Sequence, residues 1–333
     1  MSQQTFRAIA ADVLGPPDNY EIREFPMPEP GAHQVLVKIA AAGIGYADEL
    51  MARGGYQLTP PTPFVPGSEF AGVVAAAGAA VTRFKPGDRV CGHNMGHTLA
   101  EFVAAEEANL WPLPDTLSFA AGASFLVNYQ TSLYALKQRG QLAPGETLLV
   151  LGAAGGVGCA AVQLGKVMGA TVIAAASSEG KRNFALSIGA DHAVDYTKAD
   201  WRTDLKQLTG GRGVDVVYDP VGGDSFEAAF RSLAWRGRHL VIGFVGGPIP
   251  KLPANLPLLK GASLVGVDIR QFGIFEPEES ASNTDLLWQM LSEGRIDPPT
   301  GPQFPFPQFR EAMAMAASGK AMGKVVLIVG EEG

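Results

Sequence analysis

Cysteine is scarce in this 333-residue chain, which holds only Cys91 and Cys159, in unrelated contexts. Two cysteines exclude a disulfide scaffold and suit a reducing cytosol, so we expect a cytoplasmic protein. No apolar run approaches the roughly 18 residues of a membrane-spanning helix. The N-terminal stretch also lacks the basic and apolar regions of a signal peptide. We therefore expect no membrane segment.

Positive charge is in deficit as well. The 26 Lys and Arg residues face 33 Asp and Glu residues, which gives a formal net charge of −7. This balance disfavours binding along a phosphate backbone, so we expect no nucleic-acid partner. Charged residues make up only 18% of the chain and apolar residues 47%, which is enough for a sizeable core. The length suggests two domains.

The chain has two textures. Residues 1 to about 120 hold short apolar runs broken by Pro and Gly, a pattern that predicts β-strands with few helices. From about residue 124, apolar runs such as 147–152 alternate with helical stretches of about 10–15 residues, which predicts parallel βαβ units. Regularity fades after about residue 270. There, Phe304, Phe306 and Phe309 in a Pro-rich stretch favour an ordered, packed connection.

A glycine-rich turn is the strongest local motif. The sequence LVLGAAGGVG follows a buried strand and opens a helix, where a phosphate-binding turn must lie. Glycines allow the backbone to approach a pyrophosphate, and the helix N-terminus offers free N–H groups. The spacing departs from strict G-x-G-x-x-G. The residues of this turn predicted to contact the cofactor are Gly155, Gly156, Val157 and Gly158.

The next strand end indicates which dinucleotide binds. An NAD site places Asp or Glu about 20 residues after the turn, but here Ala176 is followed by Ser177 and Ser178. Lys181 and Arg182 follow in the first turn of the next helix. A hydroxyl and two cations suit a 2′-phosphate, which a carboxylate would repel, so we expect NADPH rather than NADH.

These motifs together resemble the medium-chain dehydrogenase/reductase superfamily. The resemblance rests on AAGGVG after a strand, TSLYAL before it, and the N-terminal stretches AAGIGYADELMARGGY and VPGSEFAGVV. It is closest to the zinc-free quinone oxidoreductase branch, of the zeta-crystallin type. It implies an α/β protein with a GroES-like β-barrel catalytic domain (residues 1–125 and 270–333) and a Rossmann doubly wound parallel-sheet domain (residues 126–269).

The residues that hold zinc in related enzymes are missing. Zinc-dependent members of the superfamily carry Cys before an Asp and His before a Glu, whereas this chain has GYAD, with Gly45, and PGSE, with Ser68. We therefore expect no metal. The competing cluster is Cys91, His93 and His97, which we interpret as part of a glycine-rich loop.

The resemblance also implies an active site. Tyr46 and Tyr56 match the region where quinone reductases place aromatic substrate contacts, and a tyrosine hydroxyl can donate a hydrogen bond to a quinone or enone oxygen. Further cofactor contacts carried over by position are Asn128, Thr131, Tyr196, Phe244 and Lys324. The implied function is NADPH-dependent reduction of a small quinone or α,β-unsaturated carbonyl.

Two other functions remain open from the sequence. One is reduction of an enoyl thioester of the acrylyl-CoA type, for which Arg53 is the only hint of a phosphate contact. The other is a non-catalytic NADPH-binding or redox-sensing role. The resemblance further implies a homodimer joined through residues 263–267, although this short apolar run could also be an interior strand.

Overall fold

The computed structural model describes residues 4–330, which form two compact units. The first unit comprises the chain up to Val127 and from Pro299 onward, and the second unit comprises Asn128–Pro298. Between residues 4 and 330, no helix has both the length and the apolar character needed to cross a membrane.

A seven-stranded sheet forms most of the first unit. Its order is β14-β15-β3-β4-β5-β7, with β6 paired to β3, and a separate antiparallel pair is made by β1 and β2. The strands are β1 (Thr5–Ala10), β2 (Glu21–Pro26), β3 (Gln34–Ile44), β4 (Glu69–Ala77), β5 (Arg89–His93), β6 (Phe102–Glu106), β7 (Leu110–Pro112), β14 (Thr300–Pro305) and β15 (Lys324–Ile328). The helices are α1 (Tyr46–Ala52), α2 (Phe119–Gly122) and α11 (Phe309–Ala317).

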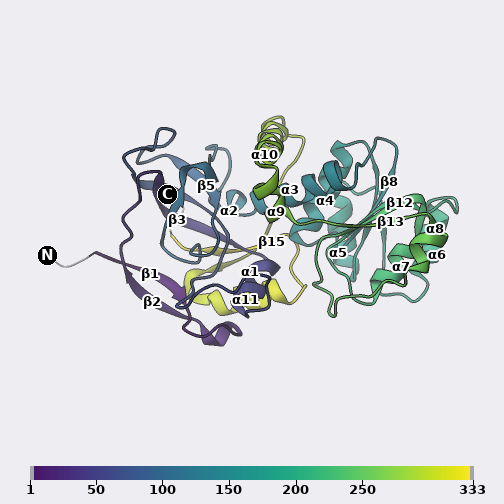
Figure 1. The fold of residues 1–333 in the computed structure, drawn as a ribbon, viewed down its shortest axis with the longest axis horizontal. Helices are drawn as coiled ribbons and strands as arrows, with labels where there is room; N and C mark the ends of the chain where they lie inside the picture. The colour runs from purple at the N-terminus through teal and green to yellow at the C-terminus, as the bar shows by residue number, and fades with distance from the viewer. Residues whose placement is uncertain (1–3, 331–333) are drawn as a thin grey trace. The chain divides into compact units, whose positions relative to one another are not determined.

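The C-terminal segment completes this unit. Strand β15 pairs antiparallel with β3, and in Figure 1 β15 and α11, coloured yellow, lie among the purple and blue N-terminal elements. Phe306 and Phe309 are buried in the same core as Ile39 and Phe70. The ordered packing expected for the Pro-rich stretch is therefore confirmed.

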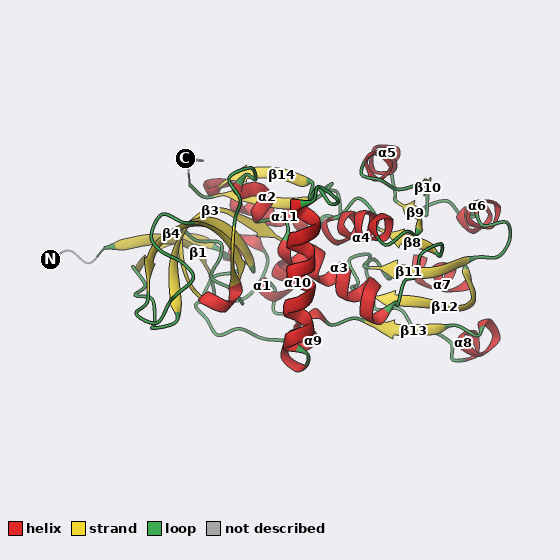
Figure 2. Cartoon of the chain, turned by 90° about the horizontal axis from the view of Figure 1, so that it is seen from above, coloured by secondary structure: helices red, strands yellow, loops and turns green. Residues whose placement is uncertain are grey.

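Six parallel strands form the sheet of the second unit, in the order β10-β9-β8-β11-β12-β13. Figure 2 shows this order directly. The strands are β8 (Thr147–Leu151), β9 (Thr171–Ala175), β10 (His192–Val194), β11 (Val214–Asp219), β12 (Leu233–Val241) and β13 (Ser263–Gly266). The order matches a Rossmann sheet, in which the strand order reverses between β8 and β11 while all strands stay parallel. Such sheets bind ligands at the carboxyl ends of the strands on either side of this reversal. The expected α/β fold class is confirmed.

Helices connect these strands. Strand β11 is buried along its whole length, as expected for a central strand of a parallel sheet covered on both faces. The helices are α3 (Leu126–Tyr134), which continues as a π-helix over Ala135–Arg139, α4 (Gly156–Val167), α5 (Glu179–Ser187), α6 (Trp201–Leu208), α7 (Ser225–Arg231), α8 (Asn255–Lys260), α9 (Ile269–Phe275) and α10 (Pro277–Ser292).

The second boundary between the units differs from the expected one at 269/270. Residues 270–298, including α10, belong to the second unit. Polar side chains explain why: Gln130 on α3 donates to Thr284, and the Gln163 amide donates to the Asp297 carbonyl. These contacts join segments more than 130 residues apart, which periodicity does not reveal.

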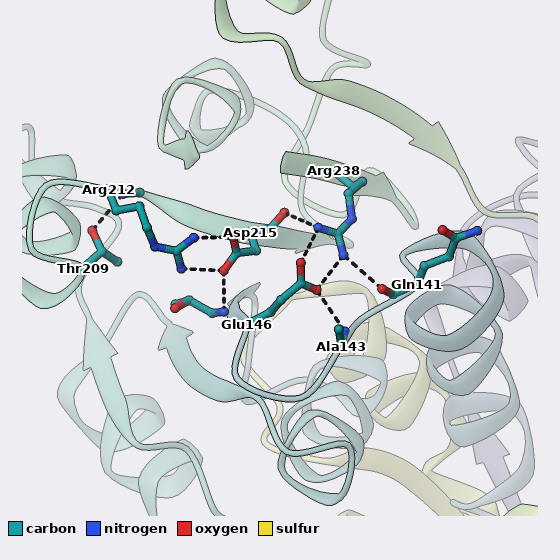
Figure 3. A network of polar contacts seen from close by, with 9 residues as sticks. Gln141, Ala143, Glu146, Thr209, Arg212, Asp215 and Arg238 are labelled. Atoms are coloured by element: carbon teal, nitrogen blue, oxygen red, sulfur yellow. Dashed lines mark hydrogen bonds and ion pairs between the residues drawn. The ribbon is translucent and has the colours of Figure 1, made fainter. Parts of the chain in front are cut away.

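An ionic network joins the amino ends of three strands in the second unit (Figure 3). Arg238 of β12 makes two hydrogen bonds of 2.7 and 2.8 Å to Glu146, just before β8. Arg212 makes two bonds of 2.6 Å to Asp215 of β11, which also accepts from the Thr147 amide at 2.8 Å. The network fixes the ends of β8, β11 and β12 against one another.

Asp215 makes this network sensitive to acid. Burial alone would raise the pKa of Asp215, but the hydrogen bonds from Arg212 and the Thr147 amide outweigh it and hold the pKa below 3.8. A lowered folded-state pKa contributes stability above the unfolded value, and this contribution is lost as the pH falls through the folded value.

We predict that Asp215→Asn lowers the melting temperature at pH 6. Between pH 6 and pH 3, the melting temperature of the variant should fall less than that of the wild type. Charge-assisted hydrogen bonds contribute about 1.5–3 kcal/mol each when shielded. The Arg212 side chain is 55% exposed, which weakens the interaction, so we expect the substitution to lower the free energy of unfolding by about 1–2 kcal/mol. Thermal unfolding across this pH range measures it, with Asp285→Asn, an exposed residue of α10, as the control. Parallel pH profiles for the Asp215 variant and the wild type would contradict the prediction.

Candidate functional site

A glycine-rich turn joins β8 to α4. Gly152 follows the strand with a left-handed φ of 58°, and α4 begins at Gly156. The helical hydrogen bonds of α4 begin at Cys159, whose amide donates to the Gly155 carbonyl one turn earlier. The amides before it have no helical acceptor, and within residues 4–330 no side chain caps this helix end. These N–H groups and the positive end of the helix dipole favour a bound pyrophosphate.

Glycines are closely packed at two positions of the turn. A Cβ on Gly158 would lie 2.2 Å from the Gly152 carbonyl oxygen, so helix and strand approach too closely for any side chain there. A Cβ on Gly156 would lie 2.9 Å from the amide nitrogen of the buried Asn128. Thr131 lies one turn further along the same face of α3. The structure therefore places Asn128 against the predicted turn.

A hydroxyl pair holds α3 to the start of α4. The Ser132 hydroxyl donates to the Val157 carbonyl at 3.0 Å and lies 2.8 Å from the Tyr218 hydroxyl. This hydrogen bond to the Val157 carbonyl fixes the first turn of α4 against α3.

The end of β9 gathers polar groups of the kind predicted. Ser177 hydrogen-bonds with the Tyr196 hydroxyl, and Lys181 lies in the first turn of α5, where burial lowers its pKa. Arg182 has a different role: it forms a 2.9 Å ion pair with Asp195. Ser177, Lys181 and Tyr196 thus come from adjoining segments, whereas Arg182 is already neutralised.

A buried acid–histidine pair shapes the carboxyl ends of β11 and β12. Asp219 Oδ2 lies 2.9 Å from His239 Nε2, and Asp219 Oδ1 accepts from the amides of Val221 and Gly222, each at 2.8 Å. A Cβ on Gly222 would lie 2.9 Å from the ring of Phe244. The carboxylate therefore sets the turn against which the predicted Phe244 packs.

The first unit buries a second charged pair. Lys324 Nζ donates to Glu69 Oε2 at 3.0 Å, and both side chains are almost fully buried. Burial raises the pKa of Glu69, although Lys324 and the Val127 amide oppose the shift. The pair forms because β15 and β4 both begin beside the end of β3. The expected contact of Lys324 with the cofactor stays a prediction.

Gly45 makes room for this pair. A Cβ on Gly45 would lie 3.2 Å from Lys324 Nζ and 3.4 Å from Asp48 Oδ2. Asp48 itself accepts from the Gly45 amide at 2.7 Å. The position where zinc-dependent relatives carry Cys is therefore next to an ammonium group.

The two predicted tyrosines belong to different local environments. Tyr46 is the first residue of α1 and half-buried, whereas Tyr56 follows the helix and packs against the core of the first unit. Arg53, the hint of a CoA contact, forms an ion pair with the buried Glu49. Arg53 is therefore committed to a neighbouring carboxylate.

The cluster of Cys91, His93 and His97 does not assemble as ligands. Among residues 4–330, no three His, Cys, Asp or Glu side chains are placed to hold a metal. Cys91 is fully buried, which raises the pKa of its thiol, and the His93 ring packs 5.5 Å from that of Trp111.

Two buried charges have partners that the sequence does not reveal. Glu69 and Asp219 each lie at the end of an apolar run in the sequence, in PGSEFAGVV and VDVVYDP. A carboxylate there must find a partner, and that was the available signal. The partners Lys324 and His239 lie too far along the chain for spacing to identify them.

Two family models and several known proteins match this chain. Residues 31–115 match the alcohol dehydrogenase GroES-like domain, and residues 156–286 match the zinc-binding dehydrogenase family model. Quinone oxidoreductase-like protein 2 of Rattus norvegicus is 40% identical over 301 residues, covering 89% of this chain and 85% of the relative.

Two solved structures are similar over nearly the whole chain. A probable oxidoreductase from Mycobacterium abscessus has a TM-score of 0.89 at 38% identity, covering 98% of this chain and 100% of that one. The quinone oxidoreductase from Thermus thermophilus, also solved in complex with NADPH, has a TM-score of 0.84 at 32% identity, covering 97% and 100%.

Proposed function

Because the chain belongs to the quinone oxidoreductase branch of the medium-chain dehydrogenase/reductase superfamily, we propose that it is an NADPH-dependent reductase of quinones or α,β-unsaturated carbonyls that works without zinc. Two features carry the proposal. The helix α4 begins with amides that have no helical acceptor, and the end of β9 is followed by Ala176, Ser177 and Ser178, with no carboxylate at these three positions and with Lys181 in the next helix turn.

The residues of the second unit fit NADPH. The amides of Gly156 and Val157 would hold the pyrophosphate, while Ser177, Lys181 and Tyr196 would hold the 2′-phosphate. The other residues of this unit that we propose to contact NADPH are Asn128, Thr131, Gly155, Gly158 and Phe244. When bound, NADPH supplies the hydride.

The reduction needs a donor for the developing oxyanion. We assign this role to the hydroxyl of Tyr46 or Tyr56, of which Tyr46 is the less constrained by core packing. Gly45 and Ser68 stand where zinc ligands stand in related enzymes, which supports chemistry without the metal. Enoyl-thioester reduction has less support, because Arg53 is paired with Glu49.

We predict NADPH oxidation with a quinone or an enone after EDTA treatment, and slower oxidation of NADH. The assay measures initial rates against a quinone, an enone and an enoyl-CoA in parallel. Turnover confined to the enoyl-CoA would identify a thioester reductase instead. Loss of activity with EDTA would implicate a metal, and NADPH binding without turnover would indicate a non-catalytic role.

The cofactor assignment makes a separate prediction. Ser177→Ala combined with Lys181→Gln should raise the KM for NADPH by roughly 10-fold or more, because two contacts to a charged phosphate are lost. The kinetics with NADH should change little, since NADH has no 2′-phosphate. Lys320→Gln, which removes an exposed lysine of the first unit, serves as the control. An unchanged preference for NADPH would refute the assignment.

We also propose a homodimer joined through β13 and a location in the cytoplasm. Strand β13 is at the edge of the sheet, where its backbone can pair with another strand. Leu264 on it is 44% exposed, and the neighbouring β12 carries Trp235 at 74%. The free, buried cysteines Cys91 and Cys159 suit a reducing compartment.

Light scattering at micromolar concentration should give the mass of a dimer. Leu264→Lys should shift the protein towards monomer, because a charge would be buried in the joined edge. Met95→Lys, at an exposed apolar residue of the first unit, should leave the mass unchanged. A monomeric wild type would overturn the proposal.

A further inference from the structure

A small pocket lies at the amino ends of β11 and β12. Its volume is about 50 Å³, several times the roughly 10–15 Å³ that accommodates one water. It sits where Gly213 and Ser232 precede the two strands, whereas the glycine-rich turn lies beyond the carboxyl end of β8 in the same parallel sheet. The lining residues are Arg202, Leu205, Lys206, Gly211, Arg212, Gly213, Arg231, Ser232, Leu233 and Lys260.

Five of the lining residues are cationic and none is acidic, in a chain whose net charge is −7. Two of the five are neutralised nearby. Arg212 is held by Asp215, as Figure 3 shows, and Arg231 pairs with Glu227 at 2.7 Å.

The other three cations have no such partner. Within the described residues, Arg202, Lys206 and Lys260 make no ion pair with a carboxylate. Burial lowers the pKa of Lys260, and the charges of Arg202 and Lys206 lower it further. The three side chains therefore repel one another across the pocket.

Helix dipoles explain part of this arrangement but not all of it. Lys206, Arg231 and Lys260 each lie in the last turn of a helix, where a cation is favoured. Each helix end carries about half a negative charge. Three such ends offset about one and a half of the three unpaired positive charges, so the pocket stays positive.

One buried donor beside this pocket also lacks an acceptor. The Nε of Arg202 is buried and has no hydrogen-bond partner among residues 4–330, although one terminal nitrogen of the same guanidinium donates to the Arg231 carbonyl. Leaving a buried charged donor without an acceptor is unfavourable, because its lost hydration is not replaced. An acceptor bound in the pocket would remove that cost and the repulsion together.

We propose that this pocket binds a small oxyanion, either inorganic phosphate or the phosphoryl group of a phosphomonoester. Arg202, Lys206 and Lys260 are its main contacts, and Arg212 is held at the rim by Asp215. The site is separate from the cofactor turn, because the two lie at opposite ends of the sheet.

Isothermal titration of the full chain with inorganic phosphate, at ionic strength held constant with chloride, tests the proposal. A second arm uses glycerol phosphate, and both arms are repeated with saturating NADPH. Tighter binding of one ligand identifies the source of the phosphoryl group. The variants are Lys206→Gln with Lys260→Gln, and the control is Lys320→Gln, an exposed lysine in the first unit.

We expect saturable binding that persists with NADPH, weakens roughly 10-fold or more in the double variant, and is unchanged in the control. In chloride alone the double variant should melt no lower than the wild type, because repulsion is relieved, so a folding defect is distinguishable. No saturable binding of either ligand, or equal affinity in wild type and double variant, would overturn the proposal.

Discussion

The close approach of helix α4 to the end of strand β8 is the constraint on which the second unit depends. Gly158 lies so near the Gly152 carbonyl that a Cβ would come within 2.2 Å. This contact directs the first amides of the helix to the carboxyl edge of the sheet. The end of β9 and the Asp219 turn meet the same edge because the strands are parallel.

Buried charge is handled differently at the two ends of this sheet. At the carboxyl end, Asp219 is fully satisfied by His239 and two backbone amides, so it fixes a turn without exposing charge. At the amino end, Arg212 and Arg238 pair with Asp215 and Glu146, and three further cations have no carboxylate partner among residues 4–330. The first unit also buries its own pair, Glu69 with Lys324. Removing one member of such a pair leaves an uncompensated charge.

Much of the fold follows from local patterns. The continuous apolar run at 147–152 and the glycines after it predict β8, the turn and α4 correctly. The Pro-rich stretch was expected to pack, and Phe306 and Phe309 are core residues. The second unit extends past residue 270, because α10 is attached to it through side-chain contacts such as Gln130 with Thr284, which a local pattern does not reveal.

The sequence alone determined the strand–turn–helix, the lack of a carboxylate at positions 176–178 directly after β9, and the absence of cysteine or histidine at the zinc positions. These depend on residue type and on neighbours within about one element. Only the tertiary structure decided that Lys324 meets Glu69, 255 residues away, and that Arg182 is neutralised by Asp195. Only the structure also brought the last turns of three helices together around one pocket. Strand pairing and helix packing create such contacts, and a linear pattern does not record which distant charges will be neighbours.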